Sequence, residues 1–213
     1  MCFQELSNMI VIIDYGMGNL GSILNMFKKT GAKALISSDL NDIKDADKLV
    51  LPGVGAFDTG MKKLDNLGIV SILNEKVIKE RTPIIGICLG MQMMTMRSEE
   101  GEMAGLGWVD AETVKFVYDK ERQHMKIPHM GWNYINIKQA HPLLDGMSST
   151  TRFYFVHSYY VACNRNDNIL ASTIYSHEFT SIIIKDNIIG VQFHPEKSNK
   201  YGMQLLKNFD NMN

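Results

Sequence analysis

The first part of the chain alternates short apolar runs with longer amphipathic segments. Runs rich in β-branched residues predict buried strands, and segments with apolar residues at helical spacing predict helices between them. The predicted strands cover 9–14, 34–36, 48–51 and 84–87, and the predicted helices cover about 20–29, 57–67 and 70–80. Such alternation is typical of βαβ units in a parallel sheet, whose binding sites gather beyond the carboxyl ends of the strands.

The pattern changes after residue 97, where short strands follow one another with turn residues between them. The clearest strands cover 152–156, 181–185 and 188–193, turns are expected at 119–120 and 186–187, and a last helix covers 200–211. We find no internal repeat or linker. The pattern predicts a single α/β domain over residues 9–213, in which a mostly parallel sheet with flanking helices carries an added antiparallel hairpin region. Residues 1–8 read as a loose N-terminal extension, and Met9 is an alternative start.

Composition narrows the class of protein. The chain has 213 residues, of which 45% are hydrophobic, and its 22 basic and 23 acidic residues give a net charge of −1. This balance provides no electrostatic basis for binding nucleic acid. The three cysteines show neither CxxC nor metal-ligand spacing, which favours free thiols in a reducing cytoplasm and no metal site. The apolar run at 9–13 is too short for a signal or membrane helix.

Cys88 lies where a predicted buried strand runs directly into a helix, with helix-forming residues continuing to about residue 96. Gly86 and Gly90 flank it, and a tight strand-to-helix turn with small neighbours is the setting of a nucleophile elbow. The amides and the helix dipole at such a turn favour a thiolate. The alternative is a buried structural cysteine.

A second candidate follows the third predicted strand, at residues 52–55 with the sequence Pro-Gly-Val-Gly. In a parallel sheet this loop lies beside the Cys88 turn, and its glycines allow backbone amides to approach a ligand. We interpret it as one side of an oxyanion hole that uses Gly53 and Val54, with the Leu89 amide on the other side. The alternative is an ordinary turn.

A third candidate is His194, which ends an apolar strand and is followed two residues later by Glu196. His194 can take the thiol proton and pass it to a leaving amine, while Glu196 fixes the imidazole tautomer. His157 is the main competing histidine, but no carboxylate lies near it in the sequence. Together with Cys88, this pair predicts acyl transfer through a thioester.

A weaker signal points to a different class of protein. Gly16, Gly18 and Gly21 follow a strand and open a helix, and Asp39 comes eighteen residues after Gly21, as in a dinucleotide-binding fingerprint. Asp14 and the residue after it separate the apolar strand from the first glycine, which weakens the match. A nucleotide-binding module therefore stays as an alternative function.

The motifs at 86–92 and 194–196 resemble those of class I, triad-type glutamine amidotransferases. Further motifs at 14–19, 51–57, 128–133, 154–159 and 190–198 are similar to the glutaminase subunits of imidazole glycerol phosphate synthases, so the resemblance runs from residue 9 almost to the C-terminus. It implies a flavodoxin-like α/β fold and hydrolysis of L-glutamine to glutamate and ammonia without a cofactor. The stretch from 99–101 to 111–112 also resembles paralogues that accompany surface-sugar biosynthesis.

Carried over motif by motif, the resemblance assigns roles to ten residues of this sequence. The catalytic residues are Cys88, His194 and Glu196; the oxyanion region comprises Gly53, Val54 and Leu89; and glutamine is held by Gly55, Gln92 and the backbone of Ser158 and Tyr159. The resemblance also implies that the loop at 52–55 rearranges when a partner is loaded, and a glycine peptide can turn at low steric cost.

A partner is expected because free ammonia is protonated in neutral water and loses its nucleophilicity, while nothing in the chain resembles an ammonia-accepting site. The resemblance supplies a (β/α)8-barrel cyclase that forms a heterodimer with the glutaminase and receives ammonia through an internal channel, in histidine biosynthesis. The residues expected near that interface are Asn19, Met130, Trp132, Tyr159 and Lys197. The alternatives are a sugar-amidinating partner and a catalytically silent regulatory role.

Overall fold

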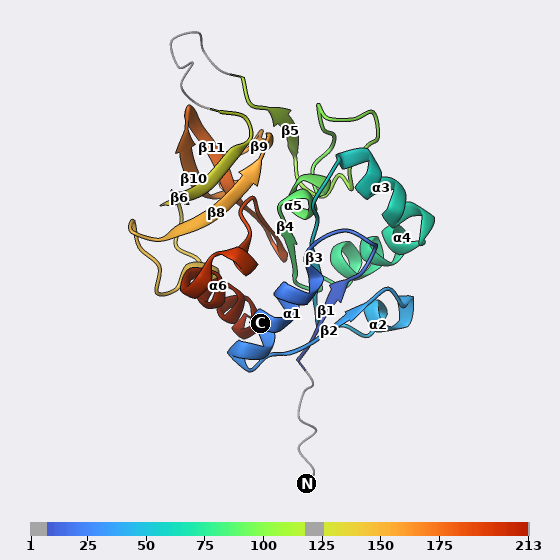
Figure 1. Ribbon diagram of the computed structural model, residues 1–213. Coiled ribbons are helices and arrows are strands. Elements are labelled where there is room, and N and C mark those ends of the chain that lie inside the picture. Colours follow the sequence, from blue (N-terminus) through green and yellow to red (C-terminus); the bar gives the residue numbers. More distant parts are fainter. Residues whose placement is uncertain (1–7, 118–125, 213) are drawn as a thin grey trace.

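The computed structural model describes residues 8–117 and 126–212 as an α/β fold built on a ten-stranded sheet (Figure 1). The sheet order is β2-β1-β3-β4-β12-β11-β10-β7, with β9 joined to β11 and β5 joined to β9. The strands are β1 (Met9–Ile13), β2 (Lys33–Ser37), β3 (Lys48–Leu51), β4 (Ile84–Ile87), β5 (Ala111–Lys115), β6 (His129–Tyr134), β7 (Asn136–Ile137), β8 (Arg152–His157), β9 (Tyr159–Cys163), β10 (Ile169–Tyr175), β11 (His177–Lys185) and β12 (Ile188–Val191).

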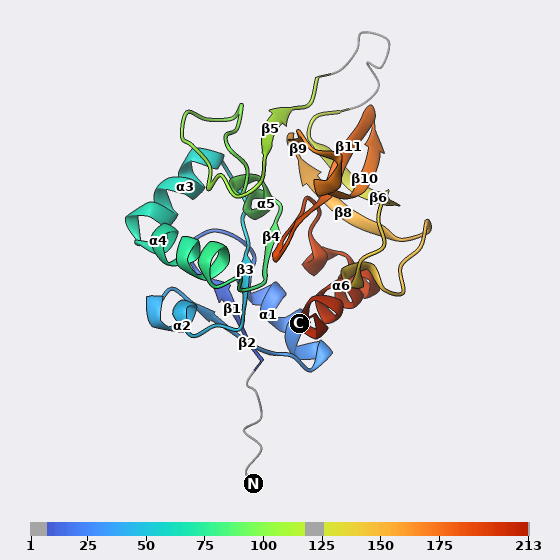
Figure 2. The same ribbon diagram turned by 180° about the vertical axis from the view of Figure 1, so that it is seen from behind.

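Helices cover both faces of the parallel part of the sheet, as Figures 1 and 2 show from opposite sides. The α-helices are α1 (Leu20–Thr30), α2 (Leu40–Lys44), α3 (Phe57–Asn66), α4 (Ile69–Leu73), α5 (Leu89–Met93) and α6 (Asn199–Asn211). Strand β1 contributes to a hydrophobic core on each face of the sheet, because successive strand residues point to opposite faces. Ile10 and Ile12 join the core beneath α1 and α6, whereas Val11 and Ile13 join the core beneath α2, α3 and α4.

The order of the parallel strands brings three chain segments to one edge of the sheet. Strand β4 pairs in parallel with β3 on one side and with β12 on the other. The loops that follow these three strands therefore lie next to one another, as the sequence predicts for the loops after β3 and β4. Beyond β12 the pairing is antiparallel, and the hairpin turn expected at 186–187 joins β11 to β12.

Strands β6 and β8 form a separate two-stranded antiparallel sheet. Phe153 of β8 stacks on Phe193, which follows β12, with the ring centroids 3.7 Å apart. This contact holds the small sheet against the chain segment that leads to His194. The backbone amide of His194 also donates to the Tyr154 carbonyl of β8, at 2.9 Å.

Several predicted boundaries are wrong, and tertiary hydrogen bonds explain two of them. The run of helix-forming residues after Cys88 ends as a helix at Met93, because the Met94 carbonyl accepts from Trp108 and Val109 instead of continuing the helix. The predicted strand 188–193 ends at Val191, and the His194 amide then donates to the Tyr154 carbonyl of β8 instead of to a strand of the main sheet. The helix predicted over 70–80 is α4 followed by a π-helical segment, η1 (Asn74–Lys79).

The expected extension of residues 1–8 lies outside the described residues except for Asn8, and so does the turn expected at 119–120. Asn8 is not loose: its side-chain amide donates to the Asp210 backbone carbonyl at 3.0 Å and to the Asp210 carboxylate at 2.8 Å. The end of the expected extension is thus bound to α6.

Candidate active site

Cys88 occupies a strained position on the turn from β4 into α5. Its backbone has φ 54° and ψ −109°, values that a residue with a side chain rarely adopts. The two flanking glycines make the turn sterically feasible. A Cβ atom at Gly90 would overlap the carbonyl oxygen of Leu51, and one at Gly86 would lie 2.7 Å from the carbonyl carbon of Gly90. The turn presents the thiol beyond the carboxyl end of β4.

His194 and Glu196 follow β12, the neighbour of β4. His194 Nδ1 lies 2.8 Å from Glu196 Oε1, and η5 (Pro195–Lys197) holds the two residues in one short 3-10 turn. The other ring nitrogen, Nε2, is buried and makes no hydrogen bond within residues 8–117 and 126–212. Burial lowers the pKa of His194, but interaction with the nearby Cys88 and Glu196 outweighs it and raises the pKa to about 10. The imidazole is thus suited to accept and hold a proton.

The Pro-Gly-Val-Gly loop at 52–55 lies against the Cys88 turn from the β3 side. A Cβ atom at Gly53 would lie 2.8 Å from Leu89 Cβ and 3.0 Å from the Gly90 amide nitrogen, so only glycine permits this approach. The Tyr15 hydroxyl anchors the loop by donating to the Pro52 carbonyl at 2.6 Å. Burial, and to a smaller extent Cys88, raises the pKa of Tyr15, which keeps this donor protonated.

A pocket of about 370 Å³ opens over the cysteine. It contains Cys88 and His194 together with the four residues expected to hold a substrate and two of the three expected in the oxyanion region. The lining residues are Val54, Gly55, Cys88, Leu89, Gln92, Glu100, Pro128, Val156, His157, Ser158, Tyr159 and His194. Gly53 and Glu196 lie behind this lining and support it. A nucleophile, a base with its carboxylate, and backbone donors therefore converge on one small cavity, which suits acyl transfer.

The chain matches the family described as glutamine amidotransferase class-I over residues 11–212. It belongs to this family. Three curated relatives, each covering 94% of this chain and 98% of their own length, have names that specify the HisH subunit of imidazole glycerol phosphate synthase. They are HisH 2 of Methanococcus maripaludis at 57% identity, HisH 2 of Pseudomonas aeruginosa at 53%, and HisH 1 of Campylobacter jejuni at 46%.

Solved structures share the fold of this amidotransferase at low sequence identity. A putative GMP synthase protein from Thermoplasma acidophilum has a TM-score of 0.70 at 20% identity, covering 95% of this chain and 92% of its own. The structure of PurLQS from Thermotoga maritima has a TM-score of 0.71 at 14% identity, covering 96% and 98%. These similarities bear on the fold and confirm the predicted α/β architecture.

Glu100 is a pocket residue of the amidotransferase that the sequence pattern did not indicate. It belongs to the loop after α5, and its Oε2 atom accepts from the Phe57 backbone amide at 2.8 Å. A carboxylate in the pocket can pair with the ammonium group of an amino acid. No spacing signals it, because the loop reaches the pocket only through tertiary contacts with the start of α3.

The competing histidine, His157, lines the same pocket but its ring nitrogens face other groups. Nδ1 lies 2.8 Å from the Tyr159 carbonyl oxygen, and Nε2 lies 3.1 Å from Nδ1 of His129. His194 is therefore the histidine whose free nitrogen is available to Cys88. Among the glycines at 16–21, Gly18 packs on the site's own loop, because a Cβ atom there would lie 3.0 Å from Pro52 Cβ. This close packing accounts for a glycine at position 18 without any bound nucleotide.

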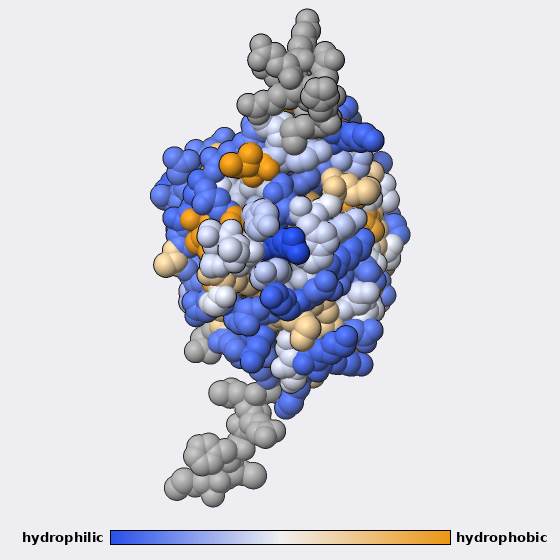
Figure 3. Space-filling view, turned by 60° about the vertical axis from the view of Figure 1, so that its left-hand side comes forward, coloured by the Kyte–Doolittle hydropathy of each residue, from blue (hydrophilic) through white to orange (hydrophobic). Residues whose placement is uncertain are grey.

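Four of the five residues expected at a partner interface are exposed and do not line the pocket. Met130 is 61% exposed and Trp132 is 42% exposed on the outer side of β6, and Asn19 and Lys197 are also exposed. Arg152 lies over the Trp132 ring at 5.5 Å. Figure 3 brings the left-hand side of Figure 1 forward and shows a largely hydrophilic surface with small hydrophobic patches. Tyr159 is half-buried and belongs to the pocket.

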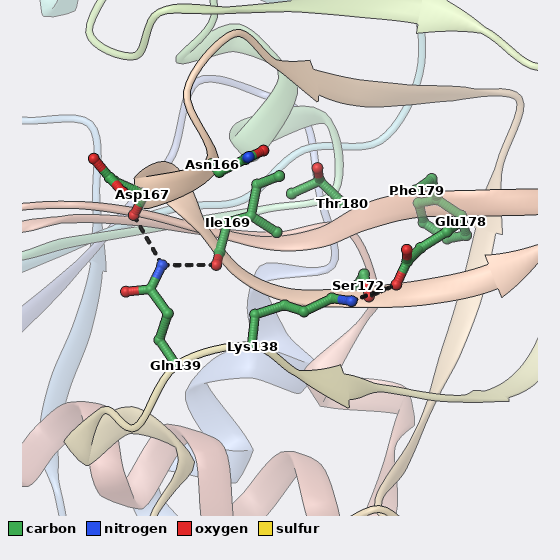
Figure 4. Close-up of a pocket in the computed structure, with 9 residues that line it drawn as sticks. All are labelled: Lys138, Gln139, Asn166, Asp167, Ile169, Ser172, Glu178, Phe179 and Thr180. Carbon is green, nitrogen blue, oxygen red and sulfur yellow. Dashed lines mark hydrogen bonds and ion pairs between the residues drawn. The ribbon is translucent and has the colours of Figure 1, made fainter.

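A second cavity, of about 540 Å³, lies beside β7, β10 and β11 (Figure 4). Its polar groups bind one another. Lys138 lies 2.6 Å from the Glu178 carboxylate, which also accepts from Ser172 at 2.6 Å. The Gln139 amide donates to two backbone carbonyls at 2.9 and 3.0 Å. We interpret this cavity as structural, because its polar side chains already satisfy one another.

Within residues 8–117 and 126–212, no group of three or more His, Cys, Asp or Glu side chains is arranged to hold a metal ion. In the same residues, no helix is long and apolar enough to cross a membrane.

Proposed function

We propose that this chain hydrolyses L-glutamine to glutamate and ammonia through a thioester on Cys88. The observation that carries the proposal is the placement of Cys88 on a strained turn beside His194, whose other nitrogen is bound to Glu196. Family membership supports the same chemistry.

The first half of the reaction makes the thioester. His194 Nε2 takes the thiol proton, and the Cys88 sulfur attacks the carbonyl carbon of the glutamine side chain. The oxygen of the tetrahedral intermediate becomes negative and accepts hydrogen bonds from the Leu89 amide and from the Gly53–Val54 loop. The C–N bond then breaks as His194 returns the proton to the leaving nitrogen, and ammonia is released.

The second half consumes water. His194 takes a proton from a water molecule, whose oxygen attacks the thioester carbonyl carbon, and the C–S bond breaks as the sulfur regains a proton. Glutamate leaves and the free thiol is restored. Glu196 accepts from His194 Nδ1 throughout, which fixes the tautomer and stabilises the imidazolium.

The pocket lining suggests how glutamine is held. Gly55 and the backbone of Ser158 and Tyr159 surround the pocket. Gln92 lines the same pocket, and its Nε2 atom donates to the Tyr159 carbonyl at 3.0 Å. We assign Glu100 to the α-ammonium group, because it is a carboxylate in the pocket wall.

We further propose that ammonia passes to a (β/α)8-barrel cyclase in a heterodimer, and that the complex makes imidazole glycerol phosphate and an aminoimidazole carboxamide ribotide. The names of the relatives support this partner. Asn19, Met130, Trp132 and Lys197 are the proposed contact residues, since they are exposed beside the pocket-forming segments. We place the enzyme in the cytoplasm, where the free thiols of Cys88 and Cys163 stay reduced.

The test is glutamate release from glutamine, measured for the chain alone and with the matching cyclase and its ribulosyl-nucleotide substrate. We expect strong stimulation by that mixture and near-total loss in Cys88→Ala. The matched control is Cys163→Ala, which removes a thiol on β9 away from the pocket. Turnover unchanged in Cys88→Ala would overturn the cysteine mechanism. Turnover that only a sugar-amidinating partner stimulates would overturn the cyclase assignment.

A further inference from the structure

The hydrogen bonds around His157 can run in only one direction. A carbonyl oxygen has no proton to give, so His157 Nδ1 must donate to Tyr159. His157 Nε2 then carries a lone pair, and His129 Nδ1, 3.1 Å away, must donate to it. His129 Nε2 in turn accepts from the Asn133 amide at 3.3 Å. The tautomers of both histidines follow from this sequence of donors and acceptors.

Asn133 fixes the outer end of this chain. Its Oδ1 atom accepts from the Tyr134 backbone amide at 2.8 Å, and its Nδ2 atom donates to the Ile174 carbonyl at 3.0 Å. Reversing the side-chain amide would place donor against donor and oxygen against oxygen. The Nδ2 atom is therefore the one that faces His129.

Burial keeps His129 and His157 neutral, as the direction of their hydrogen bonds requires. Desolvation lowers the pKa of His129 to about 4. Desolvation also lowers the pKa of His157 to about 3, with small further lowering from His129 and His194 and an opposing effect of the Tyr159 carbonyl. A neutral pair is needed because protonating His157 would set its Nε2–H against the Nδ1–H of His129.

The chain continues from Tyr159 to the sulfur. The Tyr159 carbonyl also accepts from Gln92 Nε2 at 3.0 Å, and the same nitrogen donates to Gln192 Oε1 at 3.2 Å. With its oxygen turned to Gln92, the fully buried Gln192 directs its Nε2 atom to Cys88 Sγ at 3.8 Å. Reversing the Gln192 amide would set two NH₂ groups against each other.

We propose that Gln192 is a further catalytic residue that donates a hydrogen bond to the Cys88 sulfur and stabilises its thiolate. Gln92 fixes the direction of this donor, because the Tyr159 carbonyl can only accept from it. His157, held by His129, is a positioning residue that donates to the same carbonyl and keeps it in place. A hydrogen bond donated to the charged sulfur stabilises that form, so the Gln192 donor favours the nucleophilic thiolate. The proposal deepens the proposed glutaminase function and rests on it for its catalytic meaning.

Other titratable groups face the sulfur and set the background for this effect. Tyr15 approaches from the loop after β1, His194 with Glu196 approaches from the segment after β12, and Glu100 and His157 lie in the pocket wall. Gln192 differs from all of these because it carries no charge in either protonation state of the sulfur. Its contribution is therefore measurable by removing the donor alone.

The outer end of the chain lies on β6, whose residues alternate between two sides. His129 and Asn133 face inward, whereas Met130 and Trp132 are exposed on the other side. Strand β6, which carries the outer end of the hydrogen-bond chain, is thus also the strand proposed to contact the cyclase.

The experiment measures alkylation of Cys88 by iodoacetamide as a function of pH, with the Cys88 peptide quantified by mass spectrometry to separate it from Cys2 and Cys163. Gln192→Met keeps a similar length without charge or N–H donor. We expect its alkylation near neutral pH to be about three- to tenfold slower than in the unmodified protein. A smaller shift in the same direction, about two- to threefold in rate, is expected for His129→Phe.

The matched control for His129→Phe is Tyr175→Phe. The Tyr175 ring stacks on His129 with centroids 4.0 Å apart, and its hydroxyl donates to the Lys126 carbonyl, outside the chain. This control should alkylate like the unmodified protein. Wild-type profiles in both Gln192→Met and His129→Phe would overturn the proposal, as would an equal shift in Tyr175→Phe. Circular dichroism identifies variants that fold, and His129→Phe carries the test if Gln192→Met does not fold.

Alkylation needs no turnover, so this result is independent of glutamate release. If the protein releases no glutamate but its variants show the expected changes in alkylation rate, the proposed function is contradicted. The hydrogen-bond chain to Cys88 is then still supported.

Discussion

His194 Nδ1 lies 2.8 Å from Glu196 Oε1, with only 1% and 2% of the two side chains exposed. The pair is thus shielded from water, where a carboxylate acts strongly on a neighbouring imidazole. Because Glu196 accepts from Nδ1, the lone pair of the neutral ring is on Nε2, the nitrogen that a thiol proton must reach.

Replacing Glu196 by Gln should leave the fold intact and lower kcat for glutamate release by roughly 100-fold or more, because the amide no longer fixes the tautomer or stabilises the imidazolium. Glu196 also raises the pKa of His194, so the variant should lose its protonated imidazole at a lower pH. The measurement is kcat and kcat/KM over a pH series. Glu178→Gln, which changes a carboxylate in the second cavity, is the control and should keep full activity. Equal activities in the two variants would contradict the role of Glu196.

Gly90→Ala should destabilise the protein by several kcal/mol, since the new Cβ would overlap the Leu51 carbonyl oxygen and force the backbone apart. Gly21→Ala is the matched control, because Gly21 lies in α1 with nothing within 4 Å of the added Cβ. That change should stabilise by up to about 1 kcal/mol through helix propensity. Urea unfolding measures both free energies, and similar values for the two variants would rule out this account of the turn.

Acid should destabilise the fold through His129 and His157. Their folded pKa values of about 4 and 3 lie below the ordinary value of about 6.5, so between these limits the unfolded chain binds more protons than the folded one. Stability is then lost as pH falls below about 6.5, by up to roughly 1.4 kcal/mol per pH unit for each histidine. His194 acts in the opposite sense, and mainly above that pH, because its folded pKa is raised.

The measurement is the free energy of unfolding by urea at about pH 6 and pH 5. His129→Phe should lower the slope of the unfolding free energy against pH by the contribution of one proton, up to roughly 1.4 kcal/mol per pH unit. Tyr175→Phe should leave that slope unchanged. The same slope in His129→Phe as in the unmodified protein would show that this histidine is not buried neutral.

Trp132→Ala should weaken binding to the cyclase by about tenfold or more, since a large aromatic side chain at an interface often contributes about 2 kcal/mol. The exposed ring on β6 is available for such a contact. Leu67→Ala is the control, because Leu67 is similarly exposed directly after α3. Helix α3 and strand β6 lie on opposite sides of the molecule (Figure 1). Titration calorimetry gives both affinities. Equal affinity in the two variants would remove β6 from the interface.

The sequence by itself determined the alternating strands and helices of the first part of the chain and the segments that carry the site. Cys88, the loop at 52–55 and His194 each come directly after a buried apolar run. Carboxyl ends of neighbouring parallel strands meet at one edge of the sheet, so the strand pattern placed the loop at 52–55 beside Cys88. Only the parallel pairing of β12 with β4 in the folded protein brought His194 to the same edge. The glycines around Cys88 were equally readable, because a tight turn excludes larger side chains.

Only the tertiary structure decided which distant side chains complete the pocket. Glu100 reaches it through the start of α3, and Gln192 is linked to His129 through contacts between strands far apart in the chain. The end of α5 at Met93 was likewise set by hydrogen bonds to residues 108 and 109. Such features depend on the direction of donors and acceptors across the folded core, which hydrophobic periodicity does not encode.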